Sequence, residues 1–106
     1  MNNNLVENFL DFLQNDKKLS DNTLQSYNRD IKLYRNYLDS HGLNAIDTTE
    51  DSIKEYFGEL KTEGKADSTI SRNLASLRSF YQYLYKNKVV NEDPTTHLES
   101  PKITRS

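Results

Sequence analysis

The 106-residue sequence contains no cysteine and no tryptophan, and only three glycines and two prolines. Without cysteine there is no disulfide, no thiolate metal site and no cysteine nucleophile. The scarcity of glycine and proline leaves little material for the many tight turns of a β-sandwich, so the composition favours helices. A chain of this length can bury one hydrophobic core. We therefore predict a single all-α domain.

The sequence also lacks an apolar run near the roughly 20 residues that a membrane-spanning helix requires. Its N-terminus, MNNNLVENF, has neither the basic nor the apolar region of a signal peptide. It has no glycine-rich phosphate loop, and His41 and His97 lack neighbours at the spacing of metal ligands. We therefore predict a cytoplasmic protein with no cofactor, no metal and no membrane partner.

Charge is distributed unevenly along the chain. The net charge of −2 by itself argues against a nucleic-acid partner. However, residues 17–38 carry a charge of +3 and residues 65–91 a charge of +4, whereas residues 39–64 carry −5. Two basic segments that alternate with acidic ones can present a basic surface to a polyanion despite the acidic average.

Apolar residues at three- and four-residue spacing predict four helices. The first two cover residues 4–15 and about 21–40, with Ser20 as N-cap of the second. The third is capped by Thr48 or Thr49 and ends at Gly64, and the fourth runs from a cap at Asp67 or Ser68 to about Asn87. Pro94 suits the start of a short fifth helical piece that reaches Leu98. Residues 1–3 are expected to be disordered, residues 4–98 to form the domain, and residues 99–106 to be a linker.

The apolar stripes of these helices predict the core. The residues expected to point inward are Leu5, Phe9, Phe12, Leu13, Leu24, Tyr27, Ile31, Tyr34, Leu38, Ile53, Tyr56, Phe57, Leu60, Ile70, Leu74, Leu77, Phe80, Tyr81, Leu84 and Tyr85. Because five of the seven tyrosines lie on or beside these stripes, we interpret them as packing residues rather than nucleophiles. We find no combination of nucleophile, base and oxyanion donor that would indicate catalysis.

The second and fourth predicted helices have unusual polar faces. On the second, the side opposite the core is rich in amides and cations and has no acid; on the fourth, small side chains surround Arg72. A helix in the DNA major groove needs short side chains where its backbone passes close, and Arg, Asn or Gln where it reaches bases or phosphates. The same composition also occurs on an ordinary solvated helix face or on a protein-binding surface.

Two stretches carry a family resemblance. LSDNTLQSYNRDI and DSTISRNLASLRSFYQYLYKNKVVNEDPTTHLESPK closely resemble the N-terminal core-binding domain of Xer-type tyrosine recombinases and related integrases. The most specific parts are Asn22-Thr23-Leu24 with Tyr27, Arg29 and Asp30, the run LRSFYQYLY, and the closing DP and SPK. The likeness extends from about Leu5 to Lys102.

The resemblance implies an orthogonal four-helix SAM-like bundle whose second and fourth helices contact duplex DNA at a recombination half-site. The residues expected at the DNA are Asn22, Thr23, Gln25, Ser26, Arg29, Lys32, Ser68, Ser71, Arg72, Ser76, Arg78 and Ser79. In the family, four protomers form a synaptic complex, and a C-terminal catalytic domain exchanges strands through a phosphotyrosine intermediate. These 106 residues contain no match to that domain, so the fragment alone is expected to be a catalytically inert monomer.

A function of another class stays open on the residues alone. Small helical bundles also serve as protein–protein interaction modules, and the acidic first and third helices could bind a partner. Binding of DNA through the second and fourth helices would distinguish the two functions.

Overall fold

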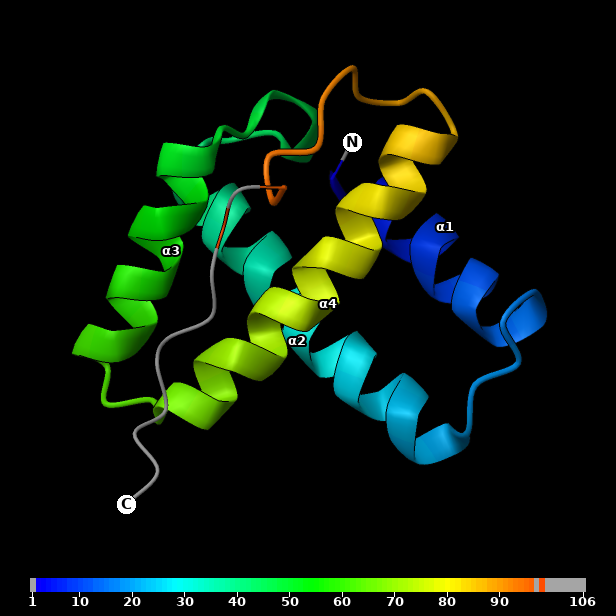
Figure 1. Ribbon diagram of the computed structural model, residues 1–106, viewed down its shortest axis with the longest axis horizontal. Helices are drawn as coiled ribbons and strands as arrows, with labels where there is room; N and C mark the ends of the chain where they lie inside the picture. Colours follow the sequence, from blue (N-terminus) through cyan, green and yellow to red (C-terminus); the bar gives the residue numbers. More distant parts are fainter. Residues whose placement is uncertain (1, 97, 99–106) are drawn as a thin grey trace. The chain divides into compact units, whose positions relative to one another are not determined.

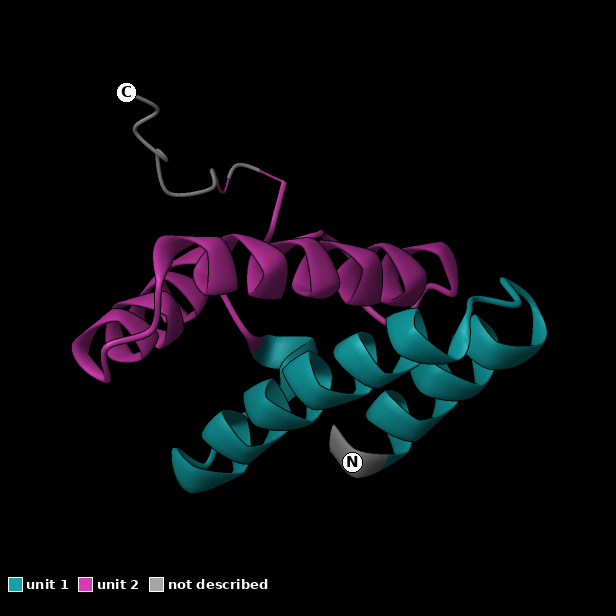
Figure 2. Ribbon diagram, turned by 90° about the horizontal axis from the view of Figure 1, so that it is seen from below, with its two compact units in different colours: residues 1–47 teal, residues 48–106 magenta. Residues whose placement is uncertain are grey.

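The computed structural model describes residues 2–96 and 98, and this part of the chain is helical without a strand. Its elements are α1 (Asn2–Asn15), α2 (Asp21–Ser40), the 3-10 turn η1 (Ala45–Asp47), α3 (Glu50–Thr62) and α4 (Asp67–Lys86) (Figure 1). The prediction of an all-α fold with four helices is therefore confirmed. The chain divides into two compact units, residues 1–47 and residues 48–106 (Figure 2).

Unit 1 contains α1 and α2 as an antiparallel pair, followed by η1 (Figure 2). Phe9 is fully buried, and its ring meets that of Tyr27 edge-on with centroids 6.2 Å apart. Such a pair stabilises a fold by about 0.5–1.5 kcal/mol beyond its buried area. Val6 is buried, whereas Leu5 and Phe12, which were expected in the core, are only half-buried. The buried stripe of α1 thus keeps the helical period but is rotated slightly from the predicted one.

Local signals fix both ends of α2. The Ser20 hydroxyl oxygen accepts the backbone N–H of Thr23 at 3.4 Å, which confirms the predicted N-cap. At the other end Gly42 has a φ of +66°, and the N–H of Leu43 donates to the carbonyl of Leu38 at 2.8 Å. Glycine suits this left-handed position because it has no Cβ. These two ends set the length of α2, and its buried apolar stripe sets which residues face outward.

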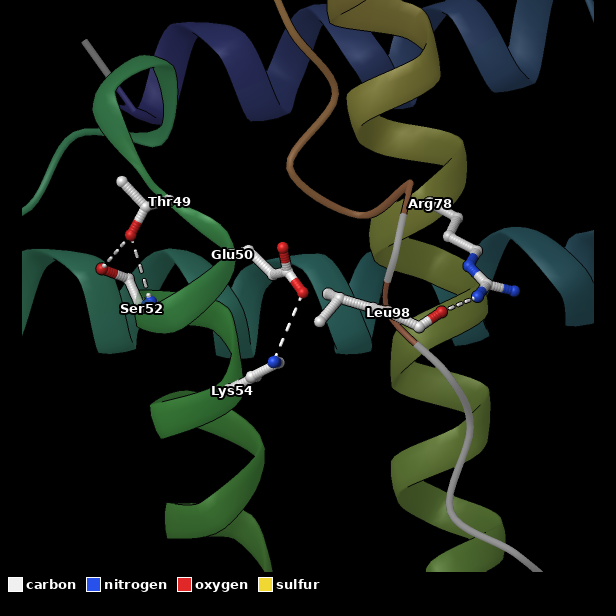
Figure 3. Close-up of polar contacts among 6 residues, drawn as sticks. All are labelled: Thr49, Glu50, Ser52, Lys54, Arg78 and Leu98. Carbon is white, nitrogen blue, oxygen red and sulfur yellow. Dashed lines mark hydrogen bonds and ion pairs between the residues drawn. The ribbon is translucent and has the colours of Figure 1, made fainter.

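Unit 2 contains α3, α4 and the segment that follows them. The Thr49 hydroxyl oxygen caps α3 by accepting the backbone N–H of Ser52 at 3.3 Å (Figure 3). The predicted cap of α4 is wrong, because Asp67 and Ser68 both lie within its first turn and Ala66 occupies the N-cap position. Gly64, which has a left-handed backbone, is followed by only two residues before α4 begins at Asp67. The N-cap position therefore falls on Ala66, whose side chain has no hydrogen-bond acceptor.

Helix α4 supplies most of the buried side chains of unit 2. The predicted core positions Ile70, Leu74, Leu77, Phe80, Tyr81 and Leu84 are all buried. Asn73 is also buried, and its side-chain amide donates to the carbonyl of Thr69 at 2.8 Å, which satisfies the polar group locally. Tyr85 was expected beside the core but is 53% exposed.

After α4 the chain turns back along that helix (Figure 1). The Asp93 carboxylate accepts the N–H of Thr95 at 2.8 Å and its hydroxyl at 2.5 Å, and Thr95 is buried. The expected fifth helical piece is instead a turn over residues 94–96, held by bonds of the i to i+3 type. The carbonyl of Leu98 accepts a hydrogen bond from Arg78, which holds this residue beside α4. The predicted linker, residues 99–106, lies outside the described residues.

Candidate nucleic-acid interface

The outer face of α2 is exposed along its length. We define the α2 stripe as the residues that lie opposite the buried Ile31, Tyr34 and Leu38 on the helix. Every one of its members is exposed: Asn22, Gln25, Ser26, Arg29, Lys32, Leu33 and Asn36. The stripe contains two cations, three amides and no carboxylate. The nearby carboxylate of Asp30 is on the inward side, where it is only 2% exposed.

Thr23, predicted among the DNA contacts, is exposed and belongs to the cap of α2. Its hydroxyl lies 2.9 Å from the Ser20 hydroxyl, and its backbone N–H donates to the same side chain. The first turn of α2 therefore presents polar groups at the positive end of the helix dipole, where an anion is stabilised.

The outer face of α4 is less polar than predicted from the sequence. We define the α4 stripe as Ser68, Arg72, Ala75, Ser79 and Lys86. Ser68, Arg72, Ala75 and Lys86 are exposed, and Ser79 is half-buried. One long cation, Arg72, is thus surrounded by side chains that are short enough for a ligand to approach the helix closely.

Ser76 does not belong to this exposed face, although the sequence analysis placed it there. It is 4% exposed. On the helix it lies beside Asn73 and Phe80, three and four residues away, and both are buried. The buried side of α4 is therefore wider than the stripe of large apolar residues indicates, and Ser76 falls within it.

Ser71 and Arg78, two further predicted contacts, lie two helical turns apart on one edge of α4. The Ser71 hydroxyl oxygen is buried and has no hydrogen-bond partner in the described part of the chain. Arg78 is exposed, but its Nη2 donates to the backbone carbonyl of Leu98 (Figure 3). The structure thus buries the Ser71 hydroxyl, although the residue is only half-buried, and engages Arg78 within unit 2.

Leu33 was not predicted as a candidate residue, because only polar side chains were expected to contact DNA. It is 38% exposed and stands within the α2 stripe, one turn after Arg29. The signal was available in the sequence, since position 33 is opposite the apolar stripe on a helical projection.

Helix α3 presents a different surface. Asp51, Glu55 and Glu59 are exposed, as is Glu63 directly after the helix, and Lys54 pairs with Glu50 at 3.3 Å (Figure 3). An exposed pair of this kind contributes about 0.3–0.5 kcal/mol. The surface of α3 is therefore strongly acidic and unsuited to a polyanion.

Neither a metal site nor a membrane-spanning helix is found in the described part of the chain. Within residues 2–96 and 98, no group of three or more His, Cys, Asp or Glu side chains is arranged to hold a metal ion. His41 packs its ring against Tyr37 with centroids 4.3 Å apart, and His97 lies outside the described residues. Of the described helices, none is long and apolar enough to cross a membrane.

Comparison with known proteins identifies relatives along nearly the whole chain. The family model "Phage integrase, N-terminal SAM-like domain" matches residues 6–88. A protein of Caldanaerobacter subterraneus subsp. tengcongensis, named as a tyrosine recombinase, is 40% identical over 105 residues, which cover 99% of this chain and 36% of that protein. The tyrosine recombinase XerD of Halalkalibacterium halodurans is 40% identical over 105 residues, with coverages of 97% and 35%.

XerD of Oceanobacillus iheyensis is 39% identical over 102 residues, which cover 94% of this chain and 34% of that protein. The chain thus spans about a third of the length of these curated relatives. The family model covers all of α2, α3 and α4, and with them both exposed stripes. The chain belongs to the phage integrase N-terminal SAM-like domain family.

Proposed function

We propose that this chain binds double-stranded DNA as the N-terminal domain of a tyrosine site-specific recombinase, with α2 and α4 against the duplex at a recombination half-site. The observation that carries the proposal is the α2 stripe, which is exposed throughout and has two cations and no carboxylate in a chain of net charge −2. Membership of the SAM-like integrase family supports it.

Each helix would contribute a different kind of contact. On α2, Arg29 and Lys32 supply positive charge for phosphates, while Asn22, Gln25 and Ser26 offer hydrogen-bonding groups to bases or backbone. On α4, Arg72 reaches the duplex, and Ser68 and Ser79 allow close approach. Thr23 would lie near a phosphate at the N-terminus of α2.

The remaining three predicted contacts have weaker support. Ser76 and the hydroxyl of Ser71 are buried, and Arg78 donates to Leu98. We therefore assign these three residues to the fold of unit 2 rather than to the DNA contact surface.

The recombinase itself would comprise more than this chain. Strand cleavage through a phosphotyrosine would be performed by a catalytic domain to which the 106 residues show no match, so the fragment itself is not the enzyme. Four protomers would assemble on two DNA sites in the cytoplasm, while the isolated domain would be a monomer that binds DNA weakly.

A protein-interaction module is the second candidate, and the acidic surface of α3 favours it. That surface would bind a basic partner, whereas the stripes of α2 and α4 would bind DNA. The two functions predict different locations for the ligand and are therefore separable by one experiment.

The test is an NMR titration of the labelled chain with a short duplex at two salt concentrations. DNA binding predicts shifts on the two stripes that weaken as salt rises. The variants Arg29→Ala and Arg72→Ala should each reduce the slope of log affinity against log salt by about 1. Lys54→Ala on α3 is the matched control and should leave the slope unchanged. Shifts confined to α3, or none at low salt, would overturn the proposal.

A further inference from the structure

Leu33 is an apolar side chain in the middle of a polar surface. Among the described residues of unit 1, it is the one large apolar side chain that is exposed, at 38%. The buried residues of α2, including Ile31 and Tyr34, lie on the opposite side of the helix. Leu33 therefore lies outside the core stripe of α2, and more than a third of its surface is open to a ligand.

The neighbours of Leu33 restrict the chemistry of the partner. Arg29 precedes it by one turn and Asn36 follows it by one turn, so the side chains of these residues are adjacent on the helix surface. Lys32 is next to it in sequence, and the α2 stripe has no carboxylate. A surface with this charge favours a polyanion over an apolar protein face, which would leave Arg29 and Lys32 without compensation.

Duplex DNA is a polyanion of this kind, and its major groove contains one type of apolar group. The major groove displays hydrogen-bonding atoms on every base pair, but only thymine adds a methyl group, which apolar side chains contact. Leu33 lies between Arg29 and Asn36 along the helix axis and about 40–60° to one side of them around it. A helix that places these two residues at base edges therefore also brings Leu33 into the major groove.

We propose that Leu33 contacts the 5-methyl group of a thymine and so makes the half-site sequence preference of this domain depend on an A·T pair beneath α2. The inference rests on the proposed DNA-binding function and extends it from duplex DNA in general to a base-specific contact. In this arrangement Arg29 and Lys32 supply affinity for the phosphates, and Leu33 distinguishes an A·T pair from other base pairs at one position.

The experiment compares thymine with uracil, which differ only in the methyl group. Duplexes are first selected by the full 106-residue chain at low salt from a pool with a randomised central segment. In a selected duplex, each thymine is then replaced in turn by uracil, and affinity is measured by fluorescence anisotropy. We expect one or two positions at which uracil weakens binding by about fourfold, the effect of losing one buried methyl group.

Variants of Leu33 then assign that effect to the residue. Leu33→Asn, of similar size but polar, should bind thymine and uracil duplexes equally at those positions, whereas Leu33→Met should keep the preference. Val89→Ala, which shortens another exposed apolar side chain outside the stripe, is the control and should keep it too. All of these positions are exposed, so the variants are expected to fold, and circular dichroism checks this.

The possible outcomes separate the two proposals. Selection of no duplex at low salt would overturn DNA binding and with it the role of Leu33. Selection of a duplex whose thymines can all be replaced without loss would overturn the thymine contact alone. An unchanged preference in Leu33→Asn would also overturn the assignment to Leu33, because another residue would then read the methyl group.

Discussion

Arg78, near the middle of α4, donates a hydrogen bond from Nη2 to the backbone carbonyl of Leu98, which lies 20 residues further along the chain (Figure 3). Leu98 and Thr95 are both buried, and the Asp93 carboxylate holds the intervening turn. The bond therefore joins the segment after α4 to that helix. Arg78 acts as a positioning residue for Leu98.

Removal of this guanidinium should loosen the segment without abolishing DNA binding. Arg78→Ala is expected to reduce the free energy of unfolding by about 1 kcal/mol, the usual net value of one hydrogen bond. Hydrogen exchange should show faster exchange at the amides of Thr95, Thr96 and Leu98. Arg78→Lys retains a cationic donor and should lose less protection.

The duplex affinities of Arg72→Ala and Arg78→Ala should differ, and the difference tests whether Arg78 contacts DNA. Both residues are exposed arginines of α4, and Arg78 is bonded to the backbone of Leu98. The affinity for duplex should fall more in Arg72→Ala than in Arg78→Ala. Equal losses would show that Arg78 is a DNA contact after all.

The relationship of Arg78 with Leu98 also shows which features the sequence could not predict. Ser20 was predicted as a cap, and Thr49 as one of two alternatives with Thr48, because a cap joins residues only three positions apart. The bond between Arg78 and Leu98 depends on the path of the chain after α4, which local spacing does not encode. The sequence therefore predicted Arg78 as a surface cation and missed its partner.

The exposure of the predicted DNA contacts was anticipated better on α2 than on α4. On α2, all six predicted contacts are exposed, since they stand opposite a narrow core face. On α4, the buried side includes polar Asn73 and Ser76, and a search for large apolar residues underestimates its width. Small residues such as Ser are compatible with either environment, so their side of the helix had to come from the structure.

The N-terminus of α4 offers a site for stabilisation. Ala66 occupies the N-cap position with extended backbone angles, φ −70° and ψ 155°, and cannot accept a hydrogen bond through its side chain. Ala66→Ser should supply a hydroxyl oxygen to the N–H of Thr69 and raise the free energy of unfolding by about 1 kcal/mol. Urea unfolding measures the change.

Ala66→Val tests whether the cap causes this gain. Valine adds bulk at the same position but no acceptor, so it should not stabilise the domain. A gain of similar size in both variants would mean that side-chain volume rather than capping is responsible.

Gly58 is a second site at which a single substitution should stabilise the fold. It lies inside α3 and is exposed, and a Cβ built there meets no atom within 4 Å. Gly58→Ala should stabilise the domain by about 0.5–1 kcal/mol, because alanine loses less backbone entropy in a helix. Thermal unfolding should show a midpoint about 4 °C higher. Gly42→Ala makes the same chemical change at a φ of +66° and should lower the midpoint instead.

The two helices of unit 2 end in the same backbone geometry with different residues. After α3, Gly64 has a φ of +88° and the N–H of Lys65 donates to the carbonyl of Leu60 at 3.0 Å. After α4, Lys88 has a φ of +60°, and the N–H of Val89 donates to the carbonyl of Leu84 at 2.9 Å. A left-handed residue with a Cβ costs about 1–2 kcal/mol, so α4 ends at a strained position and α3 does not.

Lys88→Gly should therefore stabilise the domain, and Gly64→Ala should destabilise it. The gain at position 88 is expected to be about 0.5–1 kcal/mol, since the relief of strain is partly offset by the greater freedom of glycine in the unfolded chain. The loss at position 64 should be about 1 kcal/mol. Both values come from urea unfolding of the single variants, and the distance between the sites lets the double variant serve as a check of additivity. Destabilisation by Lys88→Gly would show that the lysine side chain contributes more at the end of α4 than its backbone strain costs, for example through its charge near the negative end of the helix dipole.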